Sequence, residues 1–208
     1  NLNIQDADRR TQLHRAVING SQVTVNTLLA NGAAVHVRDL VGNQPLHYAI
    51  LGDFEAIVEL LLRFGADTNS KGQLGRSALH MSVAFQPIME LLLDTKPSLS
   101  VQDGNGNTPL HVAISHVTPL TPVRLWKHSV VDLLLEAGAD VNAANRDGVT
   151  PFHLVVGQDH SATGVQYSHL LSKFFNYGPD ISLQSQRKKM PFRGNPGEVQ
   201  EFMGPKRL

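Results

Sequence analysis

Five short blocks that end in histidine recur along the chain, and Thr108-Pro109-Leu110-His111 is the most complete of them. The other four are Thr11-Gln12-Leu13-His14, Gln44-Pro45-Leu46-His47, Ser77-Ala78-Leu79-His80 and Thr150-Pro151-Phe152-His153. Successive histidines are 33, 33, 31 and 42 residues apart. A period of this size indicates a repeat protein, in which each unit buries its apolar face against its neighbours.

A second block, Gly-Ala, follows the first at a constant distance, with Gly32 and Gly65 each 18 residues after the histidine of their unit. Between the two blocks of the second unit, apolar residues recur at offsets of three and four, which predicts two short amphipathic helices that face one apolar layer. Threonine before proline favours a helix start, and glycine favours a helix end. Helices this short are marginal alone, so stacking must stabilise them.

These blocks resemble the ankyrin repeat, which has a period of about 33 residues and the signature T-P-L-H-x-A. The resemblance implies an all-α fold, a solenoid of stacked helix-turn-helix units joined by finger loops or hairpins. It also implies one domain over residues 1–208. We expect units at about residues 6–38, 39–71, 72–102, 103–144 and 145–184, and a C-terminal cap with a basic tail at 185–208.

Three units depart from the regular pattern. The third is two residues short, which predicts a tighter turn between its helices, and it lacks the glycine, so its second helix should stop at or before Lys96. The fourth and fifth carry nine and seven extra residues, within 115–128 and 157–164. Both insertions fall in the same turn of adjacent units, and we expect them side by side on one edge.

Composition narrows the function classes. The 208 residues include 18 Lys plus Arg, 18 Asp plus Glu and no cysteine, so thiolate chemistry and a whole-surface fit to nucleic acid are both disfavoured. No apolar run approaches the length of a membrane span. The sequence predicts an intracellular protein, cytoplasmic or nuclear, with no catalytic residue, cofactor or metal site. It begins with Asn1 and carries no leader, which suggests a processed chain.

The five repeated histidines are interpreted as structural, because each copy has the same local surroundings and the family resemblance implies hydrogen bonds between units. Other residues lie in or beside the insertions, namely His116, Trp126, His128 and His160. Three hypotheses remain open for this edge: contact with a partner, a small-ligand or catalytic pocket, and self-association.

The resemblance implies a non-enzymatic module that binds another protein through its finger loops and the exposed face of each first helix. Aligned on the histidines, the expected partner-binding residues are Arg38, Leu40, Val41, Asn43, Leu51, Lys71, Gln73, Leu74, Arg76, Asn105, Asn107 and Arg146. Leu40, Val41 and Leu74 are apolar where solvent exposure is expected, and exposed apolar residues rimmed by cations are typical of a binding surface.

Asn69 and Asn142 lie two residues after the aspartates that follow the second helices. Their position is similar to the site at which an asparaginyl hydroxylase modifies ankyrin repeats. The alternative is that they stabilise the turn through hydrogen bonds from side chain to backbone.

Overall fold

A computed structural model describes residues 1–116, 129–157 and 164–182, with the side chains of 164–169 left out. Within these ranges every regular element is helical. The chain divides into two compact units, residues 1–104 and 105–208, and each is described by itself. The inserted segment 117–128, residues 158–163 and the expected cap and basic tail lie outside the described residues.

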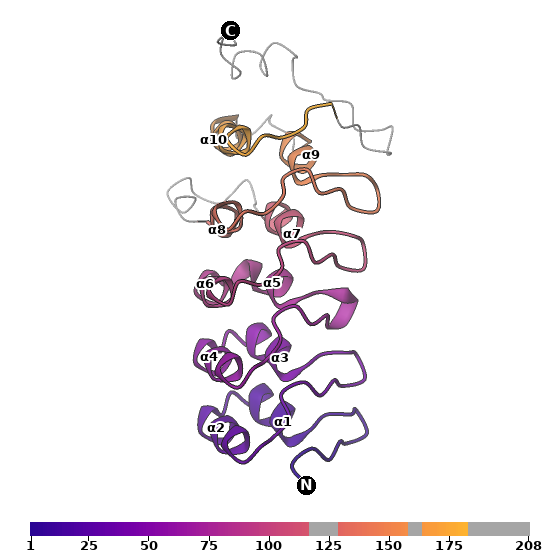
Figure 1. The fold of residues 1–208 in the computed structure, drawn as a ribbon, viewed down its shortest axis with the longest axis vertical. Helices are drawn as coiled ribbons and strands as arrows, with labels where there is room; N and C mark the ends of the chain where they lie inside the picture. Colours follow the sequence, from indigo (N-terminus) through magenta and orange to yellow (C-terminus); the bar gives the residue numbers. More distant parts are fainter. Residues whose placement is uncertain (117–128, 158–163, 183–208) are drawn as a thin grey trace. The chain divides into compact units, whose positions relative to one another are not determined.

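The first unit contains three helix pairs. Their bounds are α1 (Gln12–Ile18) with α2 (Gln22–Ala30), α3 (Pro45–Leu51) with α4 (Glu55–Arg63), and α5 (Ala78–Met81) with α6 (Gln86–Asp94). Short 3-10 turns span Gln73–Gly75 and Ser82–Ala84. The first helices α1, α3 and α5 pack in one row and the second helices α2, α4 and α6 in another. Loops extend from the row of first helices, away from the second helices (Figure 1).

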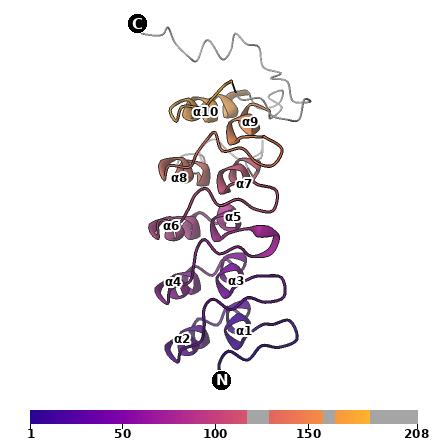
Figure 2. The same cartoon turned by 45° about the vertical axis from the view of Figure 1, so that its right-hand side comes forward.

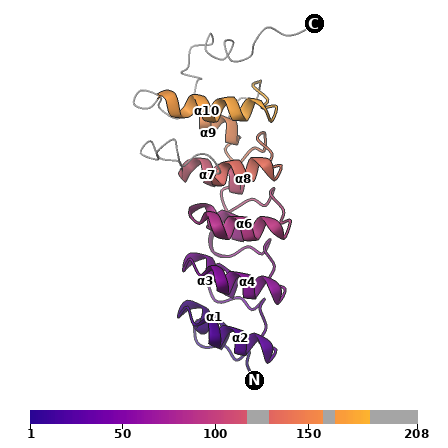
Figure 3. The same cartoon turned by 90° about the vertical axis from the view of Figure 1, so that its left-hand side faces the viewer.

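The two rows of helices lie on opposite sides of the first unit. Figure 2 shows the loops on the side of α1, α3 and α5, and Figure 3 shows α2, α4 and α6 forming the opposite face. The predicted apolar layer lies between the rows, where Leu46, Ile50, Val58 and Leu61 are fully buried. The segment before α1 is the first loop. We call residues 34–43 and 67–76 the second and third finger loops, and the face of α2, α4 and α6 the outer face.

The second unit contains two helix pairs. They are α7 (Pro109–His116) with α8 (Val130–Glu136), and α9 (Pro151–Val156) with α10 (Gly164–Phe175). The helix α9 packs on both α7 and α10. Between α8 and α10, the Lys173 ammonium pairs with the Asp132 carboxylate, whose side chain is 7% exposed. This ion pair therefore joins the two second helices of the unit.

Helix ends follow the predicted signals. Thr150 caps α9, where its hydroxyl accepts a hydrogen bond from the His153 N–H at 3.2 Å, and Pro151 occupies the first turn. Gly32 and Gly65 follow α2 and α4 with φ of 85° and 84°, in the left-handed region that glycine adopts at low cost.

In the third repeat, the turn between the two helices is tighter than in the others, as predicted. The first helix of this repeat has only four residues and continues as the 3-10 turn Ser82–Ala84 before α6 begins. The helix α6 ends at Asp94, which confirms a stop before Lys96. Lys96 itself adopts the left-handed conformation, with φ of 53°, that glycine adopts in the regular units. A non-glycine residue there carries backbone strain.

Candidate functional site

Three of the repeated histidines join a first helix to the loop that follows it. The Gln44 N–H donates to Nδ1 of His47 at 3.0 Å, and Nε2 of His47 lies 3.1 Å from the Ser70 carbonyl oxygen. Because a backbone amide can only donate, Nδ1 must be unprotonated and Nε2 must carry the proton. His14 makes the same contacts with Thr11 and Asn43, and His111 with Thr108 and Val149. The structural interpretation is confirmed for these three histidines.

Acidification should destabilise the fold through these rings. Burial is the largest cause that lowers the pKa of His14 and His47 below 6.5. The unfolded chain therefore takes up protons first as the pH falls below 6.5, and stability is lost toward the lower folded pKa. Each histidine that stays neutral in the folded chain lowers the free energy of unfolding by up to about 1.4 kcal/mol for every pH unit between the unfolded and the folded pKa. Urea unfolding at pH 7.5 and pH 5.5 measures this loss, and equal stabilities would contradict it.

Asparagines after the second helices connect adjacent finger loops. Oδ1 of Asn69 accepts from the Ser98 N–H at 2.8 Å, and Oδ1 of Asn142 accepts from the Asp180 N–H at 2.7 Å. The Asn142 amide also donates to the Gly178 carbonyl oxygen at 3.2 Å. Both side chains thus have the turn-stabilising role that we set against hydroxylation, and their modification stays a prediction.

An aspartate holds the turn of the second finger loop. Oδ1 of Asp39 accepts from the Val41 and Asn43 N–H groups at 3.1 and 2.9 Å. The same turn forms at Asp6 in the first repeat and at Asn145 in the fifth, each eight residues before its histidine. These residues were not predicted from the sequence, although their constant offset from the histidine was a visible signal. They position the residues at the fingertips.

Four of the predicted contact residues are large, apolar and exposed. The exposed fraction is 59% for Leu40, 47% for Val41, 55% for Leu51 and 68% for Leu74. The three fingertip residues occupy successive finger loops, and Leu51 is the last residue of the first helix α3. The predicted exposure of Leu40, Val41 and Leu74 is thus confirmed, whereas their contact with a partner stays a prediction.

Two cations stand beside these apolar residues and link consecutive loops. A guanidinium N–H of Arg38 donates to the carbonyl oxygens of Gly42 and Lys71. The Lys71 ammonium donates to the Gln102 carbonyl oxygen at 2.7 Å. Both side chains are exposed, as is Gln73. The loops therefore hold Arg38 and Lys71 in place without a carboxylate partner among the described residues.

Asn43 and Arg76 do not have the exposure that we expected of contact residues. Asn43 is 2% exposed, and its Oδ1 accepts from the Gln73 N–H at 2.8 Å. Arg76 is half-buried, and its Nε is enclosed by the protein. Both side chains are therefore part of the internal structure of the finger loops. Neither residue belongs to the exposed surface of the fingertips.

The third finger loop holds Leu74 in a strained conformation. Leu74 has φ of 59° and ψ of 18°, and it precedes Gly75 with φ of 71°. Its carbonyl oxygen accepts from the Gly104 N–H at 2.8 Å, so the strained turn contacts the next loop. The left-handed conformation costs a non-glycine residue about 1–2 kcal/mol. Strain of this kind is typical of functional positions.

Replacement of Leu74 by glycine should therefore stabilise the fold by about 0.5–1 kcal/mol, since relief of strain exceeds the extra entropy of unfolded glycine. Lys96→Gly is a matched control, because it relieves the same conformation away from the fingertips. We expect both variants to gain stability in urea unfolding, and only Leu74→Gly to lose partner binding. A loss of stability in Leu74→Gly would contradict the strain.

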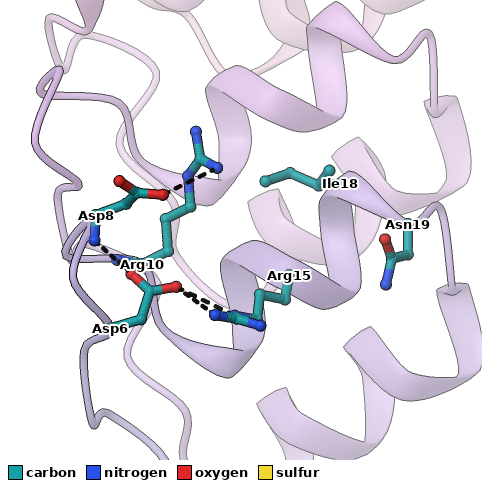
Figure 4. Close-up of a pocket in the computed structure, with 6 residues that line it drawn as sticks. All are labelled: Asp6, Asp8, Arg10, Arg15, Ile18 and Asn19. Carbon is teal, nitrogen blue, oxygen red and sulfur yellow. Dashed lines mark hydrogen bonds and ion pairs between the residues drawn. The ribbon is translucent and has the colours of Figure 1, made fainter.

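A surface hollow of about 310 Å³ lies beside the first helix (Figure 4). Asp6 and Asp8 border it from the first loop, and Arg15, Ile18 and Asn19 border it from α1 and its end. The Asp6 carboxylate accepts from Nε and Nη2 of Arg15 at 3.1 and 2.7 Å. The hydrogen bond from the Arg10 backbone N–H is the largest cause that lowers the pKa of Asp6, and the hydrogen bonds from the Arg15 side chain are the second. The charged groups Asp6 and Arg15 that line the hollow are thus paired with each other.

Arg10, the sixth residue of that lining, connects the hollow to the next repeat. Its Nη2 donates to the Tyr48 hydroxyl at 3.1 Å, and its guanidinium lies 5.3 Å from the centre of the Tyr48 ring. The Tyr48 hydroxyl in turn donates to Asp39 at 2.5 Å. This network was not predicted from the sequence, because its bonds join residues that are 38 and 9 positions apart and carry no motif.

The predicted residues of the second unit are placed within that unit only. Asn105 and Arg146 are exposed and Asn107 is half-buried, with its Oδ1 accepting from the Asn145 amide at 2.8 Å. His116 is exposed at the end of α7. The other members of the predicted insertion edge, Trp126, His128 and His160, lie outside the described residues.

A family model described as ankyrin repeats (3 copies) matches residues 1–72 and 51–142. The chain belongs to the ankyrin-repeat family, with the all-α fold expected of it. Ankyrin repeats are generally protein-interaction modules and are typically not enzymes. Among the described residues, no helix is long and apolar enough to cross a membrane, and no group of three or more ligand side chains is placed to hold a metal ion.

Curated relatives agree with this assignment. An ankyrin repeat protein of Rickettsia felis is 32% identical over 105 residues, which are 50% of this chain and 42% of the relative. Two ankyrin repeat proteins of fowlpox virus are 38% identical over 69 residues and 34% identical over 103 residues. These matches cover 33% and 49% of this chain, and 12% and 26% of the viral proteins. The chain spans less than half the length of each relative.

Proposed function

We propose that this chain is a non-enzymatic module that binds a partner protein through the finger loops and the adjacent end of α3. The observation that carries the proposal is the exposure of Leu40, Val41 and Leu74 on successive finger loops, together with the exposed Leu51 at the end of α3. Exposed large apolar residues on successive loops favour a protein interface, because burying them on binding is favourable.

The hydrogen bonds that hold the finger loops to the helices and to one another also support the proposal. His47 joins α3 to the loop at Ser70, and Asn69 joins that loop to Ser98. Arg38 and Lys71 add hydrogen bonds between consecutive loops. A surface held in this way loses little conformational entropy when a partner binds.

Affinity capture with fingertip variants tests the proposal. We expect Leu40→Glu/Leu74→Glu to reduce recovery of specific partners from a lysate of the source cells at least about 10-fold, a loss of about 1.4 kcal/mol in binding free energy. The reduction follows because each carboxylate must be desolvated at an apolar interface.

The control places the same new charges on the outer face. Val23 is 79% exposed in α2, and Phe64 is 41% exposed at the end of α4. Val23→Glu/Phe64→Glu should leave partner recovery unchanged. Equal recovery by the fingertip and outer-face variants, or no specific partner in any sample, would contradict the proposed function.

A further inference from the structure

We infer that the finger loops of the first unit take a partner segment that combines carboxylate side chains with apolar ones. This inference rests on the proposed function and specifies the chemistry of the partner. It comes from the distribution of charge over the first unit, together with the fixed positions of two exposed cations beside exposed leucines.

Charge in the first unit is divided between its two sides. The loops and first helices carry six cations, which are Arg9, Arg10, Arg15, Arg38, Lys71 and Arg76. These loops and first helices also carry five carboxylates, which are Asp6, Asp8, Asp39, Asp67 and Asp103. The second helices and the turns that flank them carry two cations and five carboxylates, which are Arg63, Lys96, Asp53, Glu55, Glu59, Glu90 and Asp94. The loop side is therefore the positive side, although the whole chain has no net charge.

Carboxylates on the loop side do little to offset its cations at the fingertips. Asp39 is 5% exposed and lies 3.6 Å from Nε of Arg10, Asp103 is 7% exposed, and Asp67 is exposed at the start of the third finger loop. Asp6 is bonded to Arg15, and Asp8 pairs with Arg10 at 3.8 Å. Arg38 and Lys71 instead donate to backbone carbonyl oxygens, and neither forms an ion pair with a carboxylate in the part of the chain that the structure describes.

Arg38 and Lys71 keep donors for an incoming ligand. The bonds to carbonyl oxygens use one terminal nitrogen of Arg38 and one proton of the Lys71 ammonium. A guanidinium has five N–H donors and an ammonium has three, so both can also bind a carboxylate. Because the loops already hold both side chains, a carboxylate meets positioned partners and less entropy is lost.

Apolar contacts must accompany the charge contacts. Leu40 and Val41 follow Arg38 in the second finger loop, and Leu74 follows Lys71 in the third. All three are more than 45% exposed. Leucine side chains beside cations match a segment in which aspartate or glutamate stands near leucine, isoleucine or phenylalanine. A purely acidic ligand would leave these leucines in water.

Selection from a random dodecapeptide library displayed on phage tests the inference with the full chain as bait. We expect enriched peptides to contain aspartate or glutamate together with large apolar residues. Their affinity, measured by fluorescence anisotropy, should fall at least about 10-fold in Arg38→Glu/Lys71→Glu and fall further as NaCl rises, because salt screens exposed charges. The outer-face control Glu59→Lys/Asp94→Lys should bind with unchanged affinity.

The other outcomes overturn the inference, and each shows whether the proposed function fails with it. Peptides that are basic or uncharged but are lost in Leu40→Glu/Leu74→Glu refute the acidic partner and leave the proposed function standing. Peptides that bind all variants equally refute both. A selection that enriches no peptide refutes a linear segment as the ligand, while the capture experiment still decides whether the fingertips bind a protein.

Discussion

Replacing His47 with leucine should lower the free energy of unfolding by about 3 kcal/mol. The ring is fully buried, accepts from the Gln44 N–H and donates to the Ser70 carbonyl oxygen. Leucine satisfies neither group, and each buried polar group left without a partner costs about 1–3 kcal/mol. The apolar contact of the new side chain offsets only part of this cost.

Urea unfolding followed by circular dichroism measures the effect. His36 provides the control, because it is exposed in the loop before α3, and His36→Leu should change stability by less than about 0.5 kcal/mol. The free energy of unfolding of the His47 variant should also fall less steeply with acidification, because one of the histidines that take up a proton on unfolding is absent. A His47 variant as stable as the control would contradict the structural role of the repeated histidines.

Replacing Gly72 with alanine should destabilise the fold by about 2–3 kcal/mol. A Cβ at this position would lie 2.4 Å from Oδ1 of Asn43 and 2.9 Å from Nε2 of His47. Neither atom can move freely, because Asn43 Oδ1 accepts from the Gln73 N–H and His47 bonds to Ser70. The methyl group therefore disrupts the contact between α3 and the third finger loop.

Gly65 separates this steric effect from the backbone preference of glycine. A Cβ on Gly65 meets nothing within 4 Å, but its φ of 84° disfavours alanine by about 1 kcal/mol. We expect Gly72→Ala to lose clearly more stability than Gly65→Ala in the same urea titrations. The reverse order would show that the loop does not pack as closely as described.

The repeat blocks were enough to predict most of the fold. Histidine blocks located the first helices, and the Gly-Ala blocks located the ends of the second helices. The missing glycine correctly predicted that α6 stops before Lys96. These predictions succeed because capping and periodicity act within a few residues of the signal.

Contacts between repeats were harder to predict. The bonds that join Arg10, Tyr48 and Asp39 connect residues 9 to 38 positions apart, and periodicity does not indicate them. Leu74 was predicted to be exposed, but its left-handed backbone has no sequence signal beyond the neighbouring Gly75. Asn43 was expected at the surface, yet the turn held by Asp39 directs it inward. Its alignment position alone could not show that.

Hydrogen exchange with and without a bound ligand tests the central claim most directly, using a partner from the capture experiment or a selected peptide. We predict that binding slows exchange at residues 38–43 and 71–76 and at the end of α3. Residues 55–63 and 86–94, which form α4 and α6 on the outer face, should exchange at unchanged rates. Protection confined to the outer face or to residues 117–128 would contradict binding through the finger loops.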